Sequence, residues 1–364
     1  MEKGARNLVL MSHLGRPDGK IVPEMSLKPV ADELEKLLGT HVIFLPDCVG
    51  KDVEKAIANS EPGQIFLLEN LRFHIEEEGS VKLADGSKRS ATPAELAAFR
   101  TSLSSLGDVL VNDAFGTMHR AHSSITGIAL PKVAGLLVSK ELEFFGKIME
   151  ADKIDCAILG GSKVSDKIKL IENMLDKVKL MVIGGGMAFT FLHVLKGTRI
   201  GKSLFDKDGS ALVPLIMEKA KEKGVKILLP VDFVTADKFA ADCKVGYATI
   251  EEGIPENEMG LDIGAKSIAL FSEAIKSCHL VIWNGPMGVF EFEKFSTGTR
   301  SILEALQTVT LNGGVSVVGG GDSAAAVCKW HSEDKVSHVS TGGGASLELL
   351  EGKILPGVEA LDAK

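Results

Sequence analysis

Residues 315–326 read Val-Ser-Val-Val-Gly-Gly-Gly-Asp-Ser-Ala-Ala-Ala: an apolar run, a glycine triplet and then a helix-forming stretch. The run is almost continuously apolar, which is typical of a strand buried on both faces of a parallel sheet. The same order of strand, glycine cluster and helix occurs at residues 157–167, 181–189 and 339–348. Strands that alternate with helices predict βαβ units, and therefore an α/β fold with parallel sheets.

Short runs of this kind recur along the whole chain, and a helix-like stretch follows each one. They predict strands at Asn7–Ser12, Val42–Leu45, Ile65–Glu69, Val109–Asn112, Ala157–Leu159, Met181–Ile183, Ile227–Pro230, Val281–Trp283, Val315–Val318 and His338–Ser340. One long amphipathic stretch, Leu136–Ala151, separates two series of strands. It predicts a helix that connects two α/β domains, and the alternative is a crossover helix within one large sheet.

The composition is that of an ordinary globular protein, and it excludes several classes. The 364 residues are 45% hydrophobic and 25% charged, and they are enough for two domains. A net charge of −8 argues against a general nucleic-acid binder. No apolar run reaches the roughly 20 residues of a membrane helix, and the first residues lack the apolar core of a signal peptide. The sequence therefore predicts neither a nucleic-acid partner nor a membrane partner.

The five cysteines are odd in number and scattered along the chain. None forms a Cys-x-x-Cys pair, so the pattern fits neither a disulfide framework nor a zinc module. It indicates reduced thiols and a cytoplasmic location.

Glycine is the compositional outlier, with 39 residues, against a usual share of about 7%. The carboxyl ends of parallel strands meet at one edge of a sheet, and the helix that follows each strand presents unpaired N–H groups there. Glycine also lets the backbone approach a ligand closely. One such cluster is explained by a tight turn alone, but four with the same arrangement favour a nucleotide site. The dinucleotide fingerprint Gly-x-Gly-x-x-Gly is absent, which disfavours a dehydrogenase.

Two kinds of charged residue accompany the clusters. Lys163 and Lys167 follow the first glycine pair, four residues apart at the start of a helix expected from about Val164, so both can neutralise phosphate oxygens. Asp322 follows the third cluster and is a candidate Mg²⁺ ligand, a role compatible with a helix N-cap. In the first half, histidines and arginines follow three predicted strands, which predicts a basic pocket for a small acidic substrate. A phosphoryl transfer between anionic oxygens needs no general base, and the sequence offers no obvious one.

Long motifs along the whole chain resemble the phosphoglycerate kinase family. The matching stretches are Met11–Gly19, Leu68–His74, Val111–Ser124, Leu159–Ile168, Ile183–Phe191, Leu229–Val234, Val281–Glu291, Gly319–Ser323 and Ser340–Ser346. The resemblance implies two Rossmann-like parallel-sheet domains joined by a helix, with a hinged cleft between them. It also implies a cytoplasmic monomer of glycolysis and gluconeogenesis, which transfers a phosphoryl group reversibly from 1,3-bisphosphoglycerate to ADP, giving 3-phosphoglycerate and ATP with Mg²⁺.

The resemblance also assigns domains and residues. Residues 1–135 are expected to bind the phosphoglycerate, 136–152 to form the connecting helix, 153–345 to bind the nucleotide and 346–364 to return to the N-terminal domain. The implied phosphoglycerate ligands are His13, Arg16, Arg72 and Arg120, and the implied catalytic residues are Lys163, Lys167 and Arg120. The implied nucleotide ligands are Gly161, Ser162, Lys163, Lys167, Gly185, Gly186, Leu261, Asn284, Pro286, Gly288, Val289, Glu291, Gly320, Gly321, Asp322 and Ser323, with Asp322 as the metal ligand. Within this set, Gly185, Gly186, Leu261, Asn284 and Glu291 match the adenosine site.

One departure from the family pattern concerns the N-terminus. The family begins with a strand that carries Arg-Val-Asp-Phe-Asn-x-Pro, followed by a segment with a further arginine, and the sequence here starts at what resembles the second strand. The expectation is therefore an N-terminal domain that is incomplete at its start. The alternative function is a truncated form that binds nucleotide but is impaired in catalysis.

Overall fold

The computed structural model of the chain describes residues 4–83 and 85–362. It divides into two compact units, residues 1–138 with 355–364 and residues 139–354. The division falls inside α6 (Leu136–Glu150), the helix predicted at Leu136–Ala151. The chain rejoins the first unit at Leu355, later than the boundary expected at residue 346, because α14 (Gly344–Leu350) packs against α7 (Ile168–Lys177) of the second unit.

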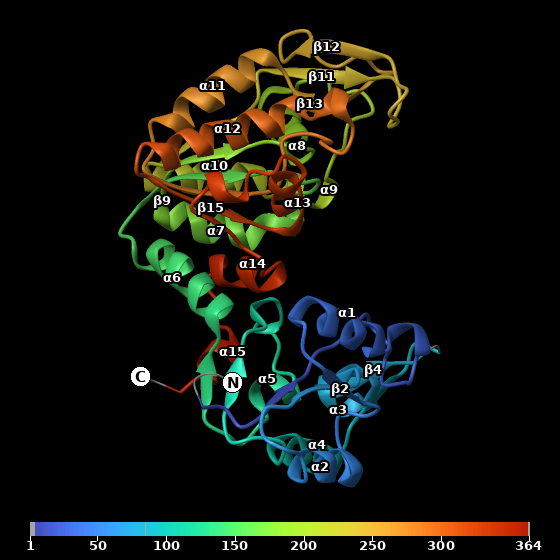
Figure 1. Ribbon diagram of the computed structural model, residues 1–364. Coiled ribbons are helices and arrows are strands. Elements are labelled where there is room, and N and C mark those ends of the chain that lie inside the picture. Colours follow the sequence, from blue (N-terminus) through green and yellow to red (C-terminus); the bar gives the residue numbers. More distant parts are fainter. Residues whose placement is uncertain (1–3, 84, 363–364) are drawn as a thin grey trace. The chain divides into compact units, whose positions relative to one another are not determined.

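The first unit contains a parallel sheet of order β1-β3-β2, a parallel pair β6-β7 and an antiparallel pair β4-β5 (Figure 1). Among the described residues, its parallel strands thus form two separate sheets. Apolar side chains of β1, β2 and β3 share a core with those of α4 and β6. The strands are β1 Leu8–Leu10, β2 Val42–Leu45, β3 Ile65–Leu68, β4 Ser80–Lys82, β5 Lys88–Ser90, β6 Leu110–Asn112 and β7 Lys132–Ala134. The helices are α1 Lys28–Leu38, α2 Lys51–Ala58, α3 Ile75–Glu78, α4 Pro93–Ser104, α5 Ser123–Thr126 and α15 Pro356–Glu359.

The C-terminal residues are tied into this first unit by backbone hydrogen bonds. The Gly357 N–H donates to the Met118 carbonyl at 2.8 Å, and the Asp362 N–H donates to the Lys132 carbonyl at 2.9 Å. Gly357 sits so close to Met118 that a Cβ there would lie 2.8 Å from the Met118 Cα. A larger residue at position 357 would therefore push the C-terminal segment away from its support.

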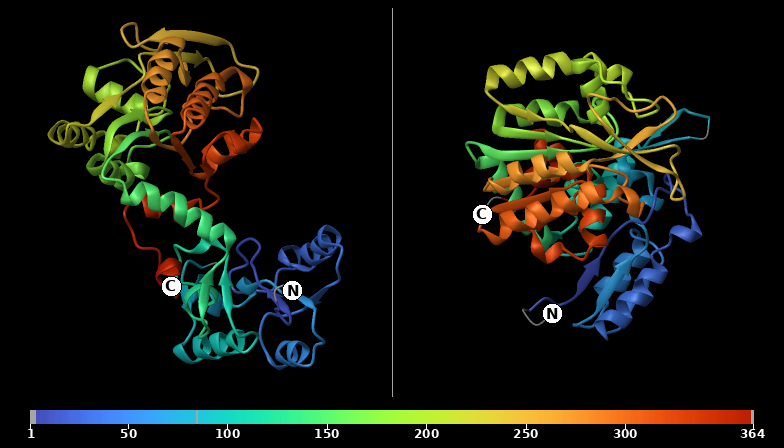
Figure 2. Two further views of the ribbon diagram at one scale, coloured as in Figure 1. Left: turned by 60° about the vertical axis from the view of Figure 1, so that its left-hand side comes forward. Right: turned by 90° about the horizontal axis from the view of Figure 1, so that it is seen from above.

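The second unit is built on a six-stranded parallel sheet of order β10-β9-β8-β14-β15-β16 (Figures 1 and 2). An antiparallel sheet of order β12-β11-β13 adjoins it. The strands are β8 Ile154–Leu159, β9 Val178–Ile183, β10 Lys226–Leu228, β11 Asp232–Ala236, β12 Val245–Thr249, β13 Met259–Ile263, β14 Leu280–Asn284, β15 Val315–Gly319 and β16 His338–Val339. The remaining helices are α8 Met187–Lys196, α9 Lys207–Ser210, α10 Val213–Lys223, α11 Ala265–Lys276, α12 Thr297–Leu311 and α13 Gly321–Lys329.

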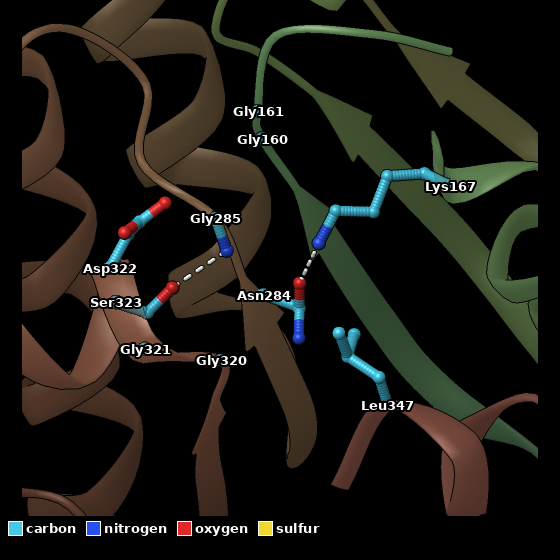
Figure 3. A pocket seen from close by; sticks show the side chains of 10 residues that line it. All are labelled: Gly160, Gly161, Lys167, Asn284, Gly285, Gly320, Gly321, Asp322, Ser323 and Leu347. Carbon is cyan, nitrogen blue, oxygen red and sulfur yellow. Dashed lines mark hydrogen bonds between the residues drawn. The ribbon is translucent and has the colours of Figure 1, made fainter. Parts of the chain in front are cut away.

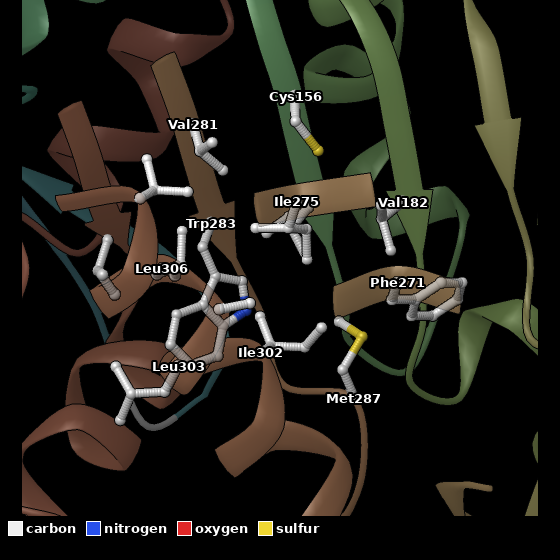
Figure 4. Close-up of a cluster of buried hydrophobic side chains, with 14 of the residues drawn as sticks. Cys156, Val182, Phe271, Ile275, Val281, Trp283, Met287, Ile302, Leu303 and Leu306 are labelled. Carbon is white, nitrogen blue, oxygen red and sulfur yellow. The ribbon is translucent and has the colours of Figure 1, made fainter. Parts of the chain in front are cut away.

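The main core of this unit lies between one face of the sheet and helices α11, α12 and α13 (Figure 4). Trp283 of β14 is fully buried there, together with Phe271 of α11 and Ile302 of α12. Residues of α7 are buried as well, and α7 packs against β9 and α10. Helices on both faces explain why the strands of this sheet are continuously apolar.

The prediction of an α/β fold with parallel sheets is confirmed, and each of the ten predicted strands overlaps a strand of the structure. Two features differ from the sequence analysis. The antiparallel strands β4, β5 and β11–β13 and the short β7 were missed. Strands β4, β5, β7 and β12 are short or largely exposed, and polar or glycine residues interrupt the apolar runs of the mostly buried β11 and β13. The helix expected from Val164 begins only at Ile168, after a 3₁₀ turn at Ser165–Lys167.

Within the described residues, no helix is both long and apolar enough to cross a membrane.

Candidate functional site

A pocket of about 150 Å³ lies in the second unit at the carboxyl ends of β8, β14 and β15 (Figure 3). Its walls are three strand-to-helix junctions, and α14 closes it with Leu347. The lining residues are Gly160, Gly161, Lys167, Asn284, Gly285, Gly320, Gly321, Asp322, Ser323 and Leu347. The glycine junctions thus meet at one edge of the sheet, as the sequence predicted.

Two of the junctions touch each other through their backbones. A Cβ on Gly160 would lie 2.0 Å from the Pro286 carbonyl oxygen, and one on Gly285 would lie 2.4 Å from the Gly160 carbonyl oxygen. Contacts this short do not occur for real side chains, and backbone cannot swing aside as a flexible side chain can. Gly285 also has a φ of 106°, which favours glycine. Glycine is therefore required at both positions to form this wall of the pocket.

The polar centre of the pocket is Asn284, whose side chain is buried at the end of β14. Its Oδ1 accepts a hydrogen bond from Lys167 Nζ, whereas its Nδ2 has no hydrogen-bond partner among the described residues. Nearby, the backbone N–H of Gly285 donates to Ser323 Oγ at 2.6 Å. A buried N–H donor without a partner is costly, and a ligand in the pocket would satisfy it.

The electrostatics of the pocket suit a polyanion. Burial lowers the pKa of Lys167, and the carboxylate of Asp322 opposes this effect most strongly. Helix α13 begins at Gly321, so its unpaired N–H groups and its partial positive charge lie at the pocket wall. Together, a buried lysine and a helix N-terminus form an anion-binding site.

A second group of predicted residues packs beside the pocket. The backbone N–H of Gly185 donates to the Met287 carbonyl at 3.2 Å, and a Cβ on Gly185 would lie 2.7 Å from the Gly161 nitrogen. The backbone N–H of Val289 donates to the Leu261 carbonyl at 2.8 Å. The loop after β14 is thus fixed against both the β9–α8 junction and the middle of β13. These contacts bring Pro286, Gly288 and Val289 close to Gly185, Gly186, Ser162 and Leu261.

The structure thus divides the predicted nucleotide ligands into two groups. Seven line the pocket, namely Gly161, Lys167, Asn284, Gly320, Gly321, Asp322 and Ser323. Asn284, which the resemblance matches to the adenosine site, accepts a hydrogen bond from Lys167 and lines the same pocket as Ser323. Glu291 is exposed and does not line the pocket.

The expectation that Lys163 and Lys167 lie on one face of a helix was wrong. Because the helix begins only at Ile168, Lys163 precedes it, and this lysine is exposed outside the pocket, near Asp206. Sequence reasoning did not assign Gly160, Gly285 and Leu347 to the site. The glycine clusters at residues 160–161 and 342–344 were the available signal, because the second of them forms the start of α14.

The first unit contains a cluster of basic side chains. Arg72 is buried after β3, where its Nη1 donates to the Gly15 carbonyl at 3.0 Å and its Nε lies 3.5 Å from Glu78 Oε1. Arg120 Nε donates to His119 Nε2 at 3.2 Å. Three strand ends far apart in the sequence therefore bring arginines and histidines together.

The pKa values of two histidines in this cluster are lowered, in part because positively charged arginines lie close to them. Burial and the neighbouring Arg72 lower the pKa of His13. Burial, with Arg72 and then Arg120, lowers the pKa of His122 to about 4. Both histidines are therefore neutral near pH 7, and an anion bound here would relieve the repulsion between the arginines. Arg16 is exposed, and no described hydrogen bond or ion pair joins it to the cluster.

The family model for phosphoglycerate kinase matches residues 1–353 of the chain. The chain belongs to the phosphoglycerate kinase family. Phosphoglycerate kinase 2 of Mus musculus is 60% identical over 364 residues, covering 99% of this chain and 87% of the relative. Phosphoglycerate kinase 1 of Homo sapiens is 58% identical over the same shares. Membership of this family makes the chain a phosphotransferase.

Solved structures of the family agree with the fold. A phosphoglycerate kinase from Coxiella burnetii matches with a TM-score of 0.82 and 39% identity, over 99% of this chain and 86% of that one. The enzyme from Pyrococcus horikoshii matches with a TM-score of 0.77 and 30% identity, over 99% and 87%. These similarities support an α/β phosphoglycerate kinase fold across nearly the whole chain.

Proposed function

We propose that the chain catalyses the reversible transfer of a phosphoryl group from 1,3-bisphosphoglycerate to ADP, giving 3-phosphoglycerate and ATP, in glycolysis and gluconeogenesis. The observation that carries the proposal is the pocket at the carboxyl edge of the six-stranded sheet. It combines Lys167, the unpartnered Nδ2 of Asn284 and the N-terminus of α13, which are donors suited to nucleotide phosphates. Gly185, Gly186, Leu261, Val289 and Glu291 are proposed to hold the adenosine.

The chemistry asks for positioning and charge neutralisation more than for proton transfer. A carboxylate of 3-phosphoglycerate is already deprotonated at neutral pH, so it attacks without a general base. Lys167, Lys163 and Arg120 are proposed to neutralise the charge that spreads over the oxygens of the transferred group. His13, Arg16, Arg72 and Arg120 are proposed to bind the phosphoglycerate, as the crowding of positive charge around His122 supports.

Mg²⁺ fits the residues present. Among the described residues that line the pocket, Asp322 is the one acid, and its carboxylate lies at the N-terminus of α13. Mg²⁺ is commonly held by one or two carboxylates together with substrate phosphates. Asp322 would hold it in this way, and the bound ion would neutralise part of the phosphate charge.

The proposal extends to a monomer in the cytoplasm. The five free cysteines support the reducing compartment. Sedimentation of the purified chain tests the monomer, and a sedimenting dimer would contradict it.

A coupled assay of the 364-residue chain tests the function. With 3-phosphoglycerate, ATP and Mg²⁺, the chain should form 1,3-bisphosphoglycerate, which a coupling dehydrogenase reduces with NADH. The oxidation of NADH should stop when Mg²⁺ is chelated. ADP binding is measured in parallel by calorimetry. A chain that binds ADP without turnover would contradict the proposed reaction and leave only a nucleotide-binding protein.

A further inference from the structure

Two cysteines lie at the edge of the six-stranded sheet opposite the pocket. Cys156 is the third residue of β8, and Cys278 lies between the end of α11 and the start of β14. The strands are parallel and neighbouring, with Val281 of β14 paired with Cys156. The pocket lies at the carboxyl ends of these strands, so the cysteines at their amino-terminal ends are outside the nucleotide site.

The surroundings bring the two thiols together. Asp155 Oδ2 accepts hydrogen bonds from the backbone N–H groups of His279, at 2.8 Å, and Leu280, at 3.0 Å. This carboxylate fixes the residue before one cysteine to the residue after the other. Cys156 belongs to the main apolar cluster of this unit, and the half-buried side chain of Cys278 packs against the same cluster and interacts with Cys156. The Cys278 thiol donates to the Ala274 carbonyl at 3.3 Å, which fixes the position of its sulfur. In Figure 4 the side chain of Cys156 points toward Ile275 in the last turn of α11, the helix that precedes Cys278.

The two cysteines differ in exposure and in acidity. Cys156 is buried, and the pKa of its thiol is raised by its hydrogen bond to Cys278 and by burial. Cys278 is half-exposed, and the hydrogen bond from Cys156 lowers the pKa of its thiol. The thiolate is the nucleophilic form of cysteine, so the accessible Cys278 is the reactive partner and the buried Cys156 is held within reach.

We propose that Cys156 and Cys278 form a peroxide-sensitive pair that closes to a reversible disulfide. The Cys278 thiolate attacks one oxygen of hydrogen peroxide and breaks the O–O bond, which gives a sulfenic acid and hydroxide. The Cys156 sulfur then attacks the sulfenic sulfur, the S–S bond forms, and the sulfenic oxygen leaves as water with the thiol proton. Overall, two thiols and one peroxide give one disulfide and two waters.

The other cysteines offer no comparable arrangement. Cys48 and Cys243 are buried, and burial raises the pKa of the Cys48 thiol. Cys328 is exposed, but its thiol contacts Glu333, which raises its pKa. Cys328 is thus a matched control for Cys278, because it is at least as accessible and lacks a described thiol neighbour.

Peptide mapping tests the pair in the full chain. After treatment with hydrogen peroxide and digestion with trypsin without reductant, peptides 154–163 and 277–294 should be recovered as one cross-linked species. Dithiothreitol should separate them. The Cys328→Ser variant should give the same species, and Cys278→Ser should give none. Recovery of Cys278 as sulfinic or sulfonic acid with a free Cys156 would overturn the proposal.

A second measurement keeps the proposal testable if the cross-linked peptide is hard to detect. In the Cys156→Ala variant the sulfenic acid on Cys278 has no partner, so dimedone should label Cys278 at least about tenfold more than in the unchanged chain. Equal labelling of the two proteins would overturn the role of Cys156. Neither experiment depends on nucleotide binding, so the outcome is independent of the proposed function.

Discussion

The candidate site of the second unit is lined mainly by backbone, whereas that of the first unit is formed by side chains. The pocket of the second unit is walled largely by backbone, with five glycines among its ten lining residues. The cluster of the first unit consists of charged side chains around Arg72, Arg120 and His122. The pocket of the second unit forms only because glycine has no Cβ atom to fill the space. The cluster of the first unit brings several positively charged side chains close together, and their mutual repulsion lowers the pKa values of the neighbouring histidines.

The electrostatics differ in the same way. In the second unit the carboxylate of Asp322 offsets the effect of burial on the pKa of Lys167. In the first unit the arginines reinforce the effect of burial on His13 and His122. In the second site a carboxylate thus offsets burial, whereas in the first the arginines add to its effect, although Glu78 lies 3.5 Å from Arg72. An anion bound beside Arg72 and Arg120 would reduce the repulsion between them. Four predictions sharpen or break this contrast.

The largest effect is expected for Lys167→Ala. Loss of this buried charge should lower kcat about 10²–10³-fold, while the ADP dissociation constant rises less than about tenfold, if Lys167 acts mainly in the transition state. Initial rates and calorimetry measure the two quantities. The matched control is Lys169→Ala, an exposed lysine two residues later on α7 and outside the pocket. A loss confined to ADP affinity would show that Lys167 serves binding only.

Gly160→Ala tests whether the pocket of the second unit depends on the close approach of the Gly160 backbone to the loop after β14. The added Cβ would meet the Pro286 carbonyl oxygen at 2.0 Å, so the strand ends must separate, at a cost of about 3 kcal/mol in the free energy of unfolding. Nucleotide affinity should fall with it. Gly146→Ala is the control, since a Cβ there meets nothing within 4 Å and lies in α6. Unchanged unfolding and ADP binding in Gly160→Ala would refute the close-approach argument.

Arg120→Ala tests the side-chain site of the first unit. The KM for 3-phosphoglycerate should rise about 10–100-fold, the worth of a charge-assisted hydrogen bond, while ADP affinity is unchanged. The pKa of His122 should also rise from about 4, because one of the charges that lowers it is removed. Kinetics and NMR titration measure these two effects. Arg89→Ala, an exposed arginine on β5, should change neither; if it changes both, the effect is one of net charge alone.

The smallest effect is an opposite pH dependence of stability in the two units. Burial and Arg72 hold the folded pKa of His122 near 4, below its ordinary 6.5, so its contribution to stability is lost as the pH falls through that range. Burial raises the pKa of Asp262 from 3.8 to about 7, although its carboxylate accepts N–H groups of Gly298 and Ile263. Its contribution is therefore lost as the pH rises toward 7.

Two variants separate these contributions. Relative to the unchanged chain, His122→Gln should gain stability as the pH falls from 6.5 toward 4, and Asp262→Asn should gain stability as the pH rises from 4 toward 7. Because both side chains are buried, each gain is expected to be at most about 1.4 kcal/mol for each unit of pH change. Hydrogen exchange at pH 5 and pH 7 reports on each unit separately. Parallel pH profiles for the two variants would contradict the assignment.

Much of the fold and of the second site could be predicted from the sequence. The glycine clusters follow apolar strands, and the geometry of a parallel sheet then places them at one edge. This reasoning identified Gly161, Lys167, Gly320 and Asp322, which the structure brings together. It did not predict where the helix starts: the 3₁₀ turn at Ser165–Lys167 delays the helix to Ile168, so that Lys167 lines the pocket and Lys163 precedes the helix.

Sequence by itself determined what short-range chemistry dictates: the parallel α/β class, the glycine junctions and the family membership carried by the motifs. Tertiary structure alone decided what depends on packing between distant segments. It placed Asn284 beside Lys167 and brought Leu347 to the pocket. It also set the thiol of Cys156 against that of Cys278. The reason is physical, because backbone propensity acts between neighbours in the chain, whereas burial, charge crowding and close approach depend on which strands the sheet pairs.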